Sequence, residues 1–349
     1  MATTAATTTF SLFLLLTVSL HTAAGRPSPY LSKTSMFPNY QKMMATFKIF
    51  IYPPNAPINF TIPALSLFYN SLLSSHLATS NPEEAHLFFV PFAPQSTRSL
   101  DRVVAGIRAA HPYWDRSLGA DHFYLSCDGV GASSSRNVVE LKKNSVQISC
   151  FPSPADKFIP HKDVTLPPLS LARRLPPAPE NKTVKFVGYY RRSGSLMGSE
   201  LINGLKNDTK FLIESEPSDE TIYIKRLKTS KFCLYVLDEE MEGFPEALAH
   251  GCVPVVITDR PIQDLPFMDV LRWQDIALFV GTRSGVEGLK RVLSHTCGER
   301  YEMMRSSGVA AAQHFVWNAS PKPYDAFNML MYQLWLRRHA IRYARWQIA

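Results

Sequence analysis

Short apolar runs separated by polar loops recur in the second half of the chain. Residues 231–237 form an apolar run with aromatic and β-branched residues, which is typical of a buried strand. A second run of this kind covers residues 253–257. Between them, Pro245 suits the first position of a short helix and Gly251 suits the left-handed residue that ends it. The pattern predicts one βαβ unit of a parallel sheet.

The first half of the chain alternates between strand and helix patterns in the same way. The predicted strands are 47–52, 86–91, 122–126 and 146–150, and the predicted helices are 64–78 and 100–110. Alternation of this kind predicts a parallel, Rossmann-like sheet.

A proline-rich segment, 167–181, is the clearest break in composition. Such segments are extended and semi-rigid, so we expect a linker there. It would separate an N-terminal domain at 46–166 from a C-terminal domain at 182–320, and the second sheet would begin near residue 184. Residues 321–349 contain a long amphipathic helical pattern.

The N-terminal residues 1–25 have the pattern of a targeting segment. Their apolar run, 10–20, is too short for a typical spanning helix. Small residues at Thr22 and Ala24 suit signal cleavage after Ala24. Entry into the secretory pathway is therefore predicted. Residues 26–45 are polar with scattered prolines, and we expect a stem or lead-in.

Charge and cysteine content narrow the classes of ligand and compartment. The net charge of +8 suits a nucleoside diphosphate, an acidic glycan or a membrane surface without choosing among them. No aromatic-plus-basic nucleic-acid module is present, and no cysteine or histidine spacing suggests zinc. The five cysteines predict one or two disulfides and a leftover thiol, with Cys127–Cys150 as the first pair expected. Glycosylation sequons at four asparagines agree with secretion: Asn59, Asn181, Asn207 and Asn318.

Glu246 lies in the first turn of the short predicted helix and faces the preceding loop. Ligands of parallel sheets bind beyond the carboxyl ends of the strands, which places residues 238–246 and 258–264 at the mouth of a site. A carboxylate there can accept hydrogen bonds from both vicinal hydroxyls of a ribose. The alternative is that Glu246 only complements the helix dipole, an effect of about 0.3–1 kcal/mol.

A second candidate anion site follows the first strand of the second sheet. A glycine-containing loop with Arg191, Arg192 and Ser193 leads into a predicted helix. A strand, loop and helix N-terminus in this order can bind an anion, and an arginine can add a bidentate contact to a diphosphate. A solvated basic turn is the alternative interpretation.

Four stretches in order carry a resemblance to a known family, and the fourth stretch contains three motifs. They are P-E-E-A-H-L-F-F-V-P-F at 82–92, H-P-Y-W-D-R-S-L-G-A-D-H-F at 111–123, K-D-V-T-L-P at 162–167, and S-K-F-C-L, E-A-L-A-H-G-C-V-P-V and L-P-F-M-D-V-L-R-W between 230 and 273. Together they resemble the exostosin-like glycosyltransferases of family GT47, particularly the plant members. The resemblance covers most of the chain after residue 45.

The resemblance implies an α/β GT-B fold, in which two Rossmann-like domains face a central cleft and a C-terminal helix packs across both. It also implies inverting, metal-independent transfer from a UDP-sugar to a cell-wall polysaccharide or glycoprotein glycan. No Asp-x-Asp metal motif occurs in the sequence. The expected donor-site residues are Glu246, Arg191, Arg192, Ser193, Lys231 and Gly251.

The family typically has a Golgi signal anchor. We therefore expect a type II Golgi membrane protein with a lumenal catalytic domain, or a secreted or lumenal protein if the signal is cleaved after Ala24. A Golgi glycosyltransferase complex is an expected partner.

The general base of such a reaction would come from the N-terminal domain. Asp128 is the first candidate because it ends a predicted strand just before a Gly-x-Gly turn, and His122 is the second. An aspartate at such a place is as often a turn former, and His122 fits a buried structural histidine. Asp121 and Glu84 are further candidates.

Two positions depart from the family pattern. Residues 235–238 replace a common Cys-Pro-Ser-Gly, and Gly243 stands where an arginine is common. Loss of a phosphate-contacting cation beside the acidic loop 238–242 favours an alternative function, a catalytically weakened glycan-binding or scaffold subunit. Arg260 and Lys231 are the candidates to compensate. A Rossmann-type binding protein unrelated to sugars is disfavoured by the signal segment, the sequons and the motif order.

Overall fold

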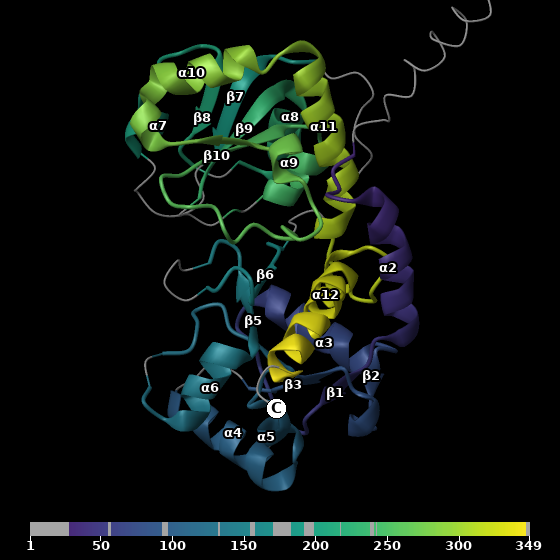
Figure 1. The fold of residues 1–349 in the computed structure, drawn as a ribbon. Coiled ribbons are helices and arrows are strands. Elements are labelled where there is room, and N and C mark those ends of the chain that lie inside the picture. The colour runs from purple at the N-terminus through teal and green to yellow at the C-terminus, as the bar shows by residue number, and fades with distance from the viewer. Residues whose placement is uncertain are drawn as a thin grey trace, which may run out of the picture.

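The molecule contains two parallel sheets, which form two lobes (Figure 1). The computed structural model describes residues 28–54, 57–92, 97–131, 133–153, 158–169, 183–191, 199–216, 218–237, 241 and 243–346. The predicted targeting segment and most of the predicted linker lie outside these ranges. No helix within them is long and apolar enough to cross a membrane.

The lower lobe holds six parallel strands in the order β2-β1-β3-β4-β5-β6. The strands are β1 (Ile49–Ile51), β2 (Ala78–Thr79), β3 (Leu87–Phe89), β4 (His122–Leu125), β5 (Val146–Cys150) and β6 (Val164–Leu166). The helices between them are α3 (Pro63–Ser74), η1 (Pro82–Glu84), α4 (Thr97–Ala110), α5 (Tyr113–Ser117) and α6 (Arg136–Asn144). Neighbouring residues of one strand point to opposite faces. Phe89 accordingly packs with α3, while Phe88 packs with α4, α5 and α6.

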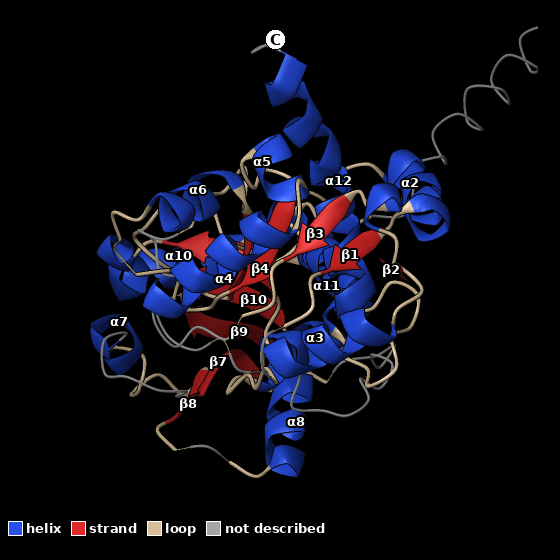
Figure 2. Ribbon diagram, turned by 90° about the horizontal axis from the view of Figure 1, so that it is seen from below, coloured by secondary structure: helices blue, strands red, loops and turns tan. Residues whose placement is uncertain are grey.

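The upper lobe holds five parallel strands in the order β11-β10-β9-β7-β8. The strands are β7 (Phe186–Arg191), β8 (Phe211–Glu214), β9 (Ser230–Val236), β10 (Val253–Ile257) and β11 (Leu278–Val280). The helices are α7 (Ser199–Asn203), α8 (Glu220–Thr229), α9 (Phe244–Ala249), η3 (Trp273–Asp275), η4 (Thr282–Ser284), α10 (Gly285–His295), α11 (Gly298–Ala312) and η5 (Gln313–Phe315). Helices flank the strands of both sheets (Figure 2). The predicted βαβ unit is confirmed as β9, α9 and β10.

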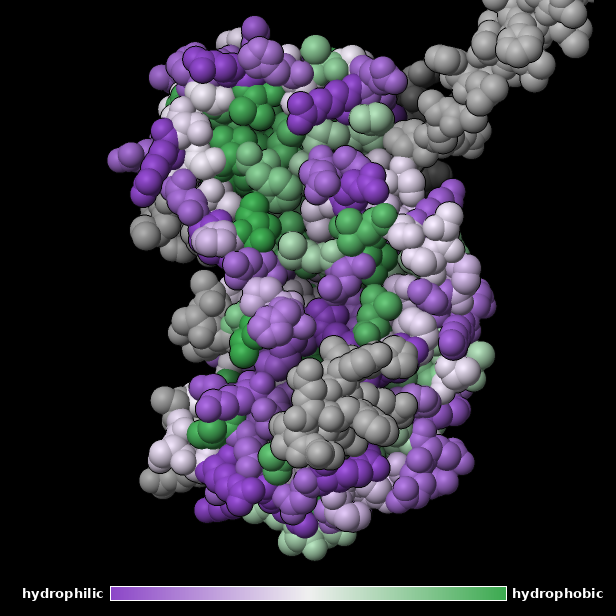
Figure 3. Space-filling model, in the orientation of Figure 1, coloured by the Kyte–Doolittle hydropathy of each residue, from purple (hydrophilic) through white to green (hydrophobic). Residues whose placement is uncertain are grey.

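The carboxyl edges of the two sheets face each other. Ser153 follows β5 in the chain and Asp264 follows β10. The amide nitrogen of Ser153 donates to Oδ2 of Asp264 over 2.7 Å. The ring of Phe151 lies with its centroid 6.2 Å from that of Phe244, the first residue of α9. An indentation separates the lobes on one side (Figure 3). Two parallel α/β sheets opposed at their carboxyl edges confirm the predicted GT-B fold.

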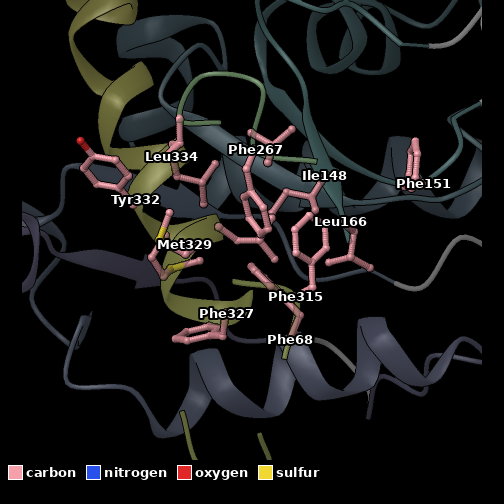
Figure 4. Close-up of a cluster of buried hydrophobic side chains, with 14 of the residues drawn as sticks. Phe68, Ile148, Phe151, Leu166, Phe267, Phe315, Phe327, Met329, Tyr332 and Leu334 are labelled. Carbon is pink, nitrogen blue, oxygen red and sulfur yellow. The ribbon is translucent and has the colours of Figure 1, made fainter. Parts of the chain in front are cut away.

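The last helix, α12 (Ala326–Trp346), packs into a core that contains residues of both lobes (Figure 4). Arg337 anchors the middle of α12 to both lobes. The guanidinium donates to the carbonyl oxygens of Lys162 and Asp163 over 3.0 and 2.9 Å, and it pairs with Asp269 over 2.7 Å. Lys162 and Asp163 precede β6, whereas Asp269 follows β10. α12 therefore contacts both lobes.

The stem predicted for residues 26–45 is wrong for most of its length. Residues 33–46 form a helix, α2 (Lys33–Thr46), which packs against α12. Its buried side chains, Met36, Tyr40 and Met43, are spaced by one helical turn. The prolines misled the prediction, because Pro38 is accommodated inside α2.

Two disulfides are formed. Cys127–Cys150 is the pair expected from the sequence, and Cys233–Cys252 is the second. Cys297 is the predicted leftover thiol and is exposed. Cys127–Cys150 joins the ends of β4 and β5 at the carboxyl edge of the lower sheet, whereas Cys233–Cys252 joins the middle of β9 to the residue before β10.

His314 joins the N-terminal segment to the start of α12. Its Nδ1 donates to the carbonyl of Tyr324 and its Nε2 accepts from the Tyr30 hydroxyl, both over 2.8 Å. Burial lowers the pKa of His314 to about 4, so the folded protein holds a neutral imidazole.

We expect the free energy of unfolding to fall between pH 6.5 and about 4, because the unfolded chain takes up a proton there that folded His314 rejects. Above this window the full stability is present. The loss is on the order of 3 kcal/mol across the window. Urea unfolding of wild type and His314→Gln over this pH range measures it. The wild type should show the steeper slope, and equal slopes would contradict the assignment.

Candidate functional site

Two tyrosine hydroxyls meet one backbone carbonyl at the carboxyl edge of the upper sheet. Tyr223 of α8 and Tyr235 of β9 each donate to the carbonyl oxygen of Gly243 over 3.0 Å. Burial raises the pKa of Tyr235 well above its usual value, and Tyr223 and the Glu246 carboxylate raise it further. Tyr235 therefore keeps its proton and remains a donor. Together the two hydroxyls fix the chain immediately before α9.

Gly243 has no space for a side chain. Its backbone has φ +75°, and a Cβ placed on it would lie 1.8 Å from the Tyr223 hydroxyl oxygen. An arginine at this position, expected in the family, would require Tyr223 to move. The packing of Tyr223 therefore requires the glycine that the sequence has at position 243 in place of arginine.

A cation reaches the same place from another strand. Arg191 is the last residue of β7, and its guanidinium carbon lies 4.3 Å from the centroid of the Tyr223 ring. This is a cation–π distance. Arg191 is therefore beside the tyrosine that contacts Gly243, at the edge where the sequence predicted a diphosphate contact. Arg192 and Ser193 lie outside the described residues.

A charged network supports the outer side of this edge. Glu214 accepts from the hydroxyls of Tyr189 and Ser218 over 2.7 and 3.1 Å. Arg226 donates to its other oxygen over 3.1 Å. Burial and the bond to Glu214 raise the pKa of Tyr189, so its hydroxyl stays protonated. The network ties the end of β8 to β7 and α8.

Glu246 is positioned as the sequence predicted, in the first turn of α9 at the carboxyl edge of the sheet. It is 1% exposed. Its charge contributes to the raised pKa of Tyr235, so the carboxylate lies close to the cluster formed by Tyr189, Tyr223 and Tyr235, which we call the tyrosine cluster. Its contact with a ribose stays a prediction.

Lys231 and Gly251 lie at the opposite edge, so their predicted donor contacts are wrong. Lys231 is the second residue of β9, and its Nζ donates to the carbonyl of Thr296 over 3.2 Å. Gly251 ends α9 with φ +65°, and a Cβ there would lie 3.1 Å from Nε of Arg305. Strand direction explains both errors, because the start of β9 and the end of α9 are at the amino edge of the sheet.

Arg260, the other candidate to compensate for the missing arginine, is at the correct edge. It follows β10 and forms a bidentate pair with Asp264 over 3.1 and 2.9 Å. Asp264 is buried and also accepts from the amide of Ser153 in the lower lobe. Arg260 thus serves the contact between the lobes.

Asp128 lies at the carboxyl edge of the lower sheet and is exposed. It follows Cys127, whose disulfide partner Cys150 is adjacent to Phe151. Phe151 packs near Phe244 of α9. These contacts place the Asp128 loop on the side of the lower lobe that faces α9.

His122 is not available for catalysis, and the prediction that it acts there is wrong. It begins β4, at the amino edge, and is fully buried. Its Nε2 lies 2.9 Å from the Tyr52 hydroxyl and its Nδ1 lies 2.9 Å from Oδ1 of Asp121. Asp121 also pairs with Arg116. The structural-histidine alternative is confirmed, and Asp121 belongs to the same buried network.

Glu84 is also remote from the facing edges. It ends η1 before β3 and accepts from the side chains of Thr79 and Asn81. Within the residues that the structure describes, no group of three or more histidine, cysteine, aspartate or glutamate side chains could hold a metal ion.

Comparison with known proteins decides the family. The model of the exostosin GT47 domain matches residues 43–296. The chain belongs to the exostosin GT47 family. This confirms the predicted resemblance and the prediction that the chain is a glycosyltransferase.

Individual relatives agree with the family. The chain is 29% identical to a probable glycosyltransferase of Arabidopsis thaliana, At3g07620, over 86% of this chain and 70% of that protein. It is 26% identical to the probable beta-1,4-xylosyltransferase IRX10 of the same plant, over 74% and 72% of the two chains. It is 27% identical to a probable glucuronosyltransferase of rice, Os01g0926700, over 64% and 62%. Among solved structures, a GtfA/B complex matches with 11% identity and a TM-score of 0.33, covering 66% of this chain and 48% of that one. That likeness is too low to add to the fold assignment.

The tyrosine cluster was missed by the sequence analysis. Tyr189, Tyr223 and Tyr235 come from β7, α8 and β9, and their sequence spacing has no shared period. A partial signal existed at Tyr235, which departs from the family pattern. In this GT47 protein the departure at Gly243 and the one at Tyr235 are two parts of one arrangement.

We expect Gly243→Ala to destabilise the fold by about 2–4 kcal/mol, from backbone strain and the clash with Tyr223 together. Gly298→Ala is the matched control, because Gly298 also has positive φ but nothing within 4 Å of the point where a Cβ would lie. Urea unfolding of both variants separates strain from clash. Equal losses would show that Tyr223 does not occupy the space at Gly243.

Proposed function

We propose that this protein is an inverting, metal-independent glycosyltransferase that moves a sugar from a UDP-sugar to a cell-wall polysaccharide or glycoprotein glycan. The proposal rests on one observation. Glu246, Arg191 and the two tyrosines that bind the Gly243 carbonyl all lie at the carboxyl edge of the upper sheet. Ligands of α/β sheets bind at this edge. The names of the xylosyl- and glucuronosyltransferase relatives support sugar transfer and do not choose the donor.

The upper lobe would bind the nucleotide. Glu246 would accept hydrogen bonds from the two ribose hydroxyls. Arg191 would bind the diphosphate, because a guanidinium pairs with phosphate oxygens in bidentate geometry. Its position over Tyr223 supplies a cation next to the backbone of Gly243, where the family arginine is absent. A fixed cation stabilises the negative charge that develops on the departing UDP.

The lower lobe would supply the base. Asp128 would remove the proton from the acceptor hydroxyl as that oxygen forms a bond to the anomeric carbon. The bond from the anomeric carbon to the UDP oxygen breaks on the opposite face, and the electron pair leaves with UDP. One displacement of this kind inverts the anomeric configuration. The exposure of Asp128 on the side facing α9 supports this role.

The cellular location belongs to the same proposal. Two disulfides suit an oxidising lumen, and the N-terminal segment suits a secretory signal or anchor. We place the catalytic lobes in the Golgi lumen, either as a type II membrane protein or as a lumenal or secreted chain.

A catalytically weakened scaffold subunit of a Golgi transferase complex is the second candidate function. Gly243 favours it, because no side chain fits at the position of the family arginine. An active transferase would bind UDP at the carboxyl edge of the upper sheet and transfer sugar, whereas a scaffold subunit would not. UDP binding and transfer rates distinguish the two functions.

We expect wild-type protein to bind UDP with micromolar affinity, unchanged by EDTA, and Glu246→Gln to bind at least tenfold more weakly because an amide is a poorer acceptor for two hydroxyls than a carboxylate. Calorimetry measures both. Glu220→Gln, an exposed change on α8, is the matched control. Unchanged affinity in Glu246→Gln would remove this residue from the site, and absence of wild-type binding would favour the scaffold function.

We expect Asp128→Asn to bind UDP like wild type while losing at least a hundredfold in transfer rate, because an amide cannot accept the acceptor proton. Release of UDP from a panel of UDP-sugars and glycan acceptors measures the rate. Asp219→Asn, also exposed, is the matched control. Full activity in Asp128→Asn would assign the base elsewhere.

A further inference from the structure

A cavity of about 560 Å³ opens at the amino edge of the upper sheet. It lies between α10 and the first residues of β8 and β9. Its volume is within the range of small-ligand sites in proteins. The tyrosine cluster and Glu246 are at the opposite edge, so this cavity is separate from the proposed donor site.

Positive charge dominates the lining of the cavity. Lys210, Lys231, Lys290 and Arg291 contribute four cations, against the two carboxylates Asp208 and Glu287. Lys290 forms an ion pair with Asp208 over 2.9 Å. Lys210 and Arg291 line the cavity and are exposed to solvent. The cavity thus presents a net positive field to a ligand, and fields focused in concave sites concentrate anions.

Lys231 is held at a fixed place within this lining. Its Nζ donates to the Thr296 carbonyl over 3.2 Å and lies 4.5 Å from the centroid of the Tyr301 ring. These contacts use part of the hydrogen-bonding capacity of an ammonium, which has three donors. A charge positioned in advance loses less side-chain entropy on binding.

Most of the remaining lining is apolar, and Ser294 is its polar member. Phe211 and Phe232 contribute rings, and Val187 and Leu293 contribute aliphatic surface. The ring of Phe211 lies directly on β7, since a Cβ on Gly188 would be 2.6 Å from it. Glycine at 188 is what allows this close approach. The cavity therefore combines an apolar wall with cations.

We propose that this cavity binds a carboxylated sugar residue of an acidic polysaccharide. A uronate has the matching chemistry: its carboxylate pairs with ammonium and guanidinium groups, and the C–H face of its ring packs on apolar and aromatic surface. A simple inorganic anion would leave the apolar wall unused. The site goes beyond the proposed transfer reaction and does not depend on it.

The test is calorimetric binding of tri-galacturonic acid to the full chain at low ionic strength. We expect the double charge reversal Lys210→Glu and Arg291→Glu to weaken binding at least tenfold, because both are solvent-exposed cations of the cavity lining. Lys142→Glu with Lys143→Glu is the matched control, since it makes the same change in net charge on exposed residues of α6 in the other lobe. Affinity for UDP should be unchanged in both variants.

Several outcomes would overturn the proposal. They are absence of wild-type binding, equal weakening in the control pair, or binding of inorganic phosphate as tight as that of the trisaccharide. A neutral trisaccharide should not bind. If the double reversal lowers the melting temperature strongly, Arg291→Ala replaces it, with an expected weakening of at least threefold.

Because the readout is binding of a sugar acid, failure of this test leaves the transfer proposal intact. Conversely, loss of UDP binding in Glu246→Gln says nothing against the cavity. The two sites are thus tested separately.

Discussion

The shared hydrophobic core under α12 is the constraint on which the relative position of the lobes depends. Ile148 and Leu166 enter it from the lower sheet, and Phe267 and Phe315 enter it from segments that follow β10 (Figure 4). Apolar surface from both lobes is removed from water in a single cluster, so separation of the lobes would expose both sides at once. Movement between the lobes must therefore slide or bend this core while keeping it closed.

Much of the fold was predictable because its strands are buried on both faces. Such strands are near-continuous apolar runs, and β5 and β10 were predicted to the residue for that reason. α2 was not predicted, because its burial rests on three side chains and the tyrosine partner for Tyr40 is in a distant segment. A contact with Tyr324 cannot be detected by local periodicity.

The sequence predicted a site residue correctly only where it showed which end of a strand that residue lies at. Glu246, Arg191 and Asp128 follow or end strands, and the structure places all three at the facing edges. Lys231 was predicted at the wrong edge of the sheet. It lies five residues before the end of β9, which at about 3.3 Å per residue is roughly 16 Å from that end. The contact of Tyr223 and Tyr235 with Gly243 depends on three elements meeting, which no pattern within one element encodes.

The two disulfides close rings of the chain, and each ring includes a loop at one of the two facing edges. Cys127–Cys150 encloses Asp128, and Cys233–Cys252 encloses Gly243 and Glu246. A protease that cuts once inside either ring leaves the two pieces covalently joined, so the nicked protein migrates as one chain until it is reduced. The residues proposed for the base and for the ribose contact thus remain tethered to their own sheets after backbone cleavage.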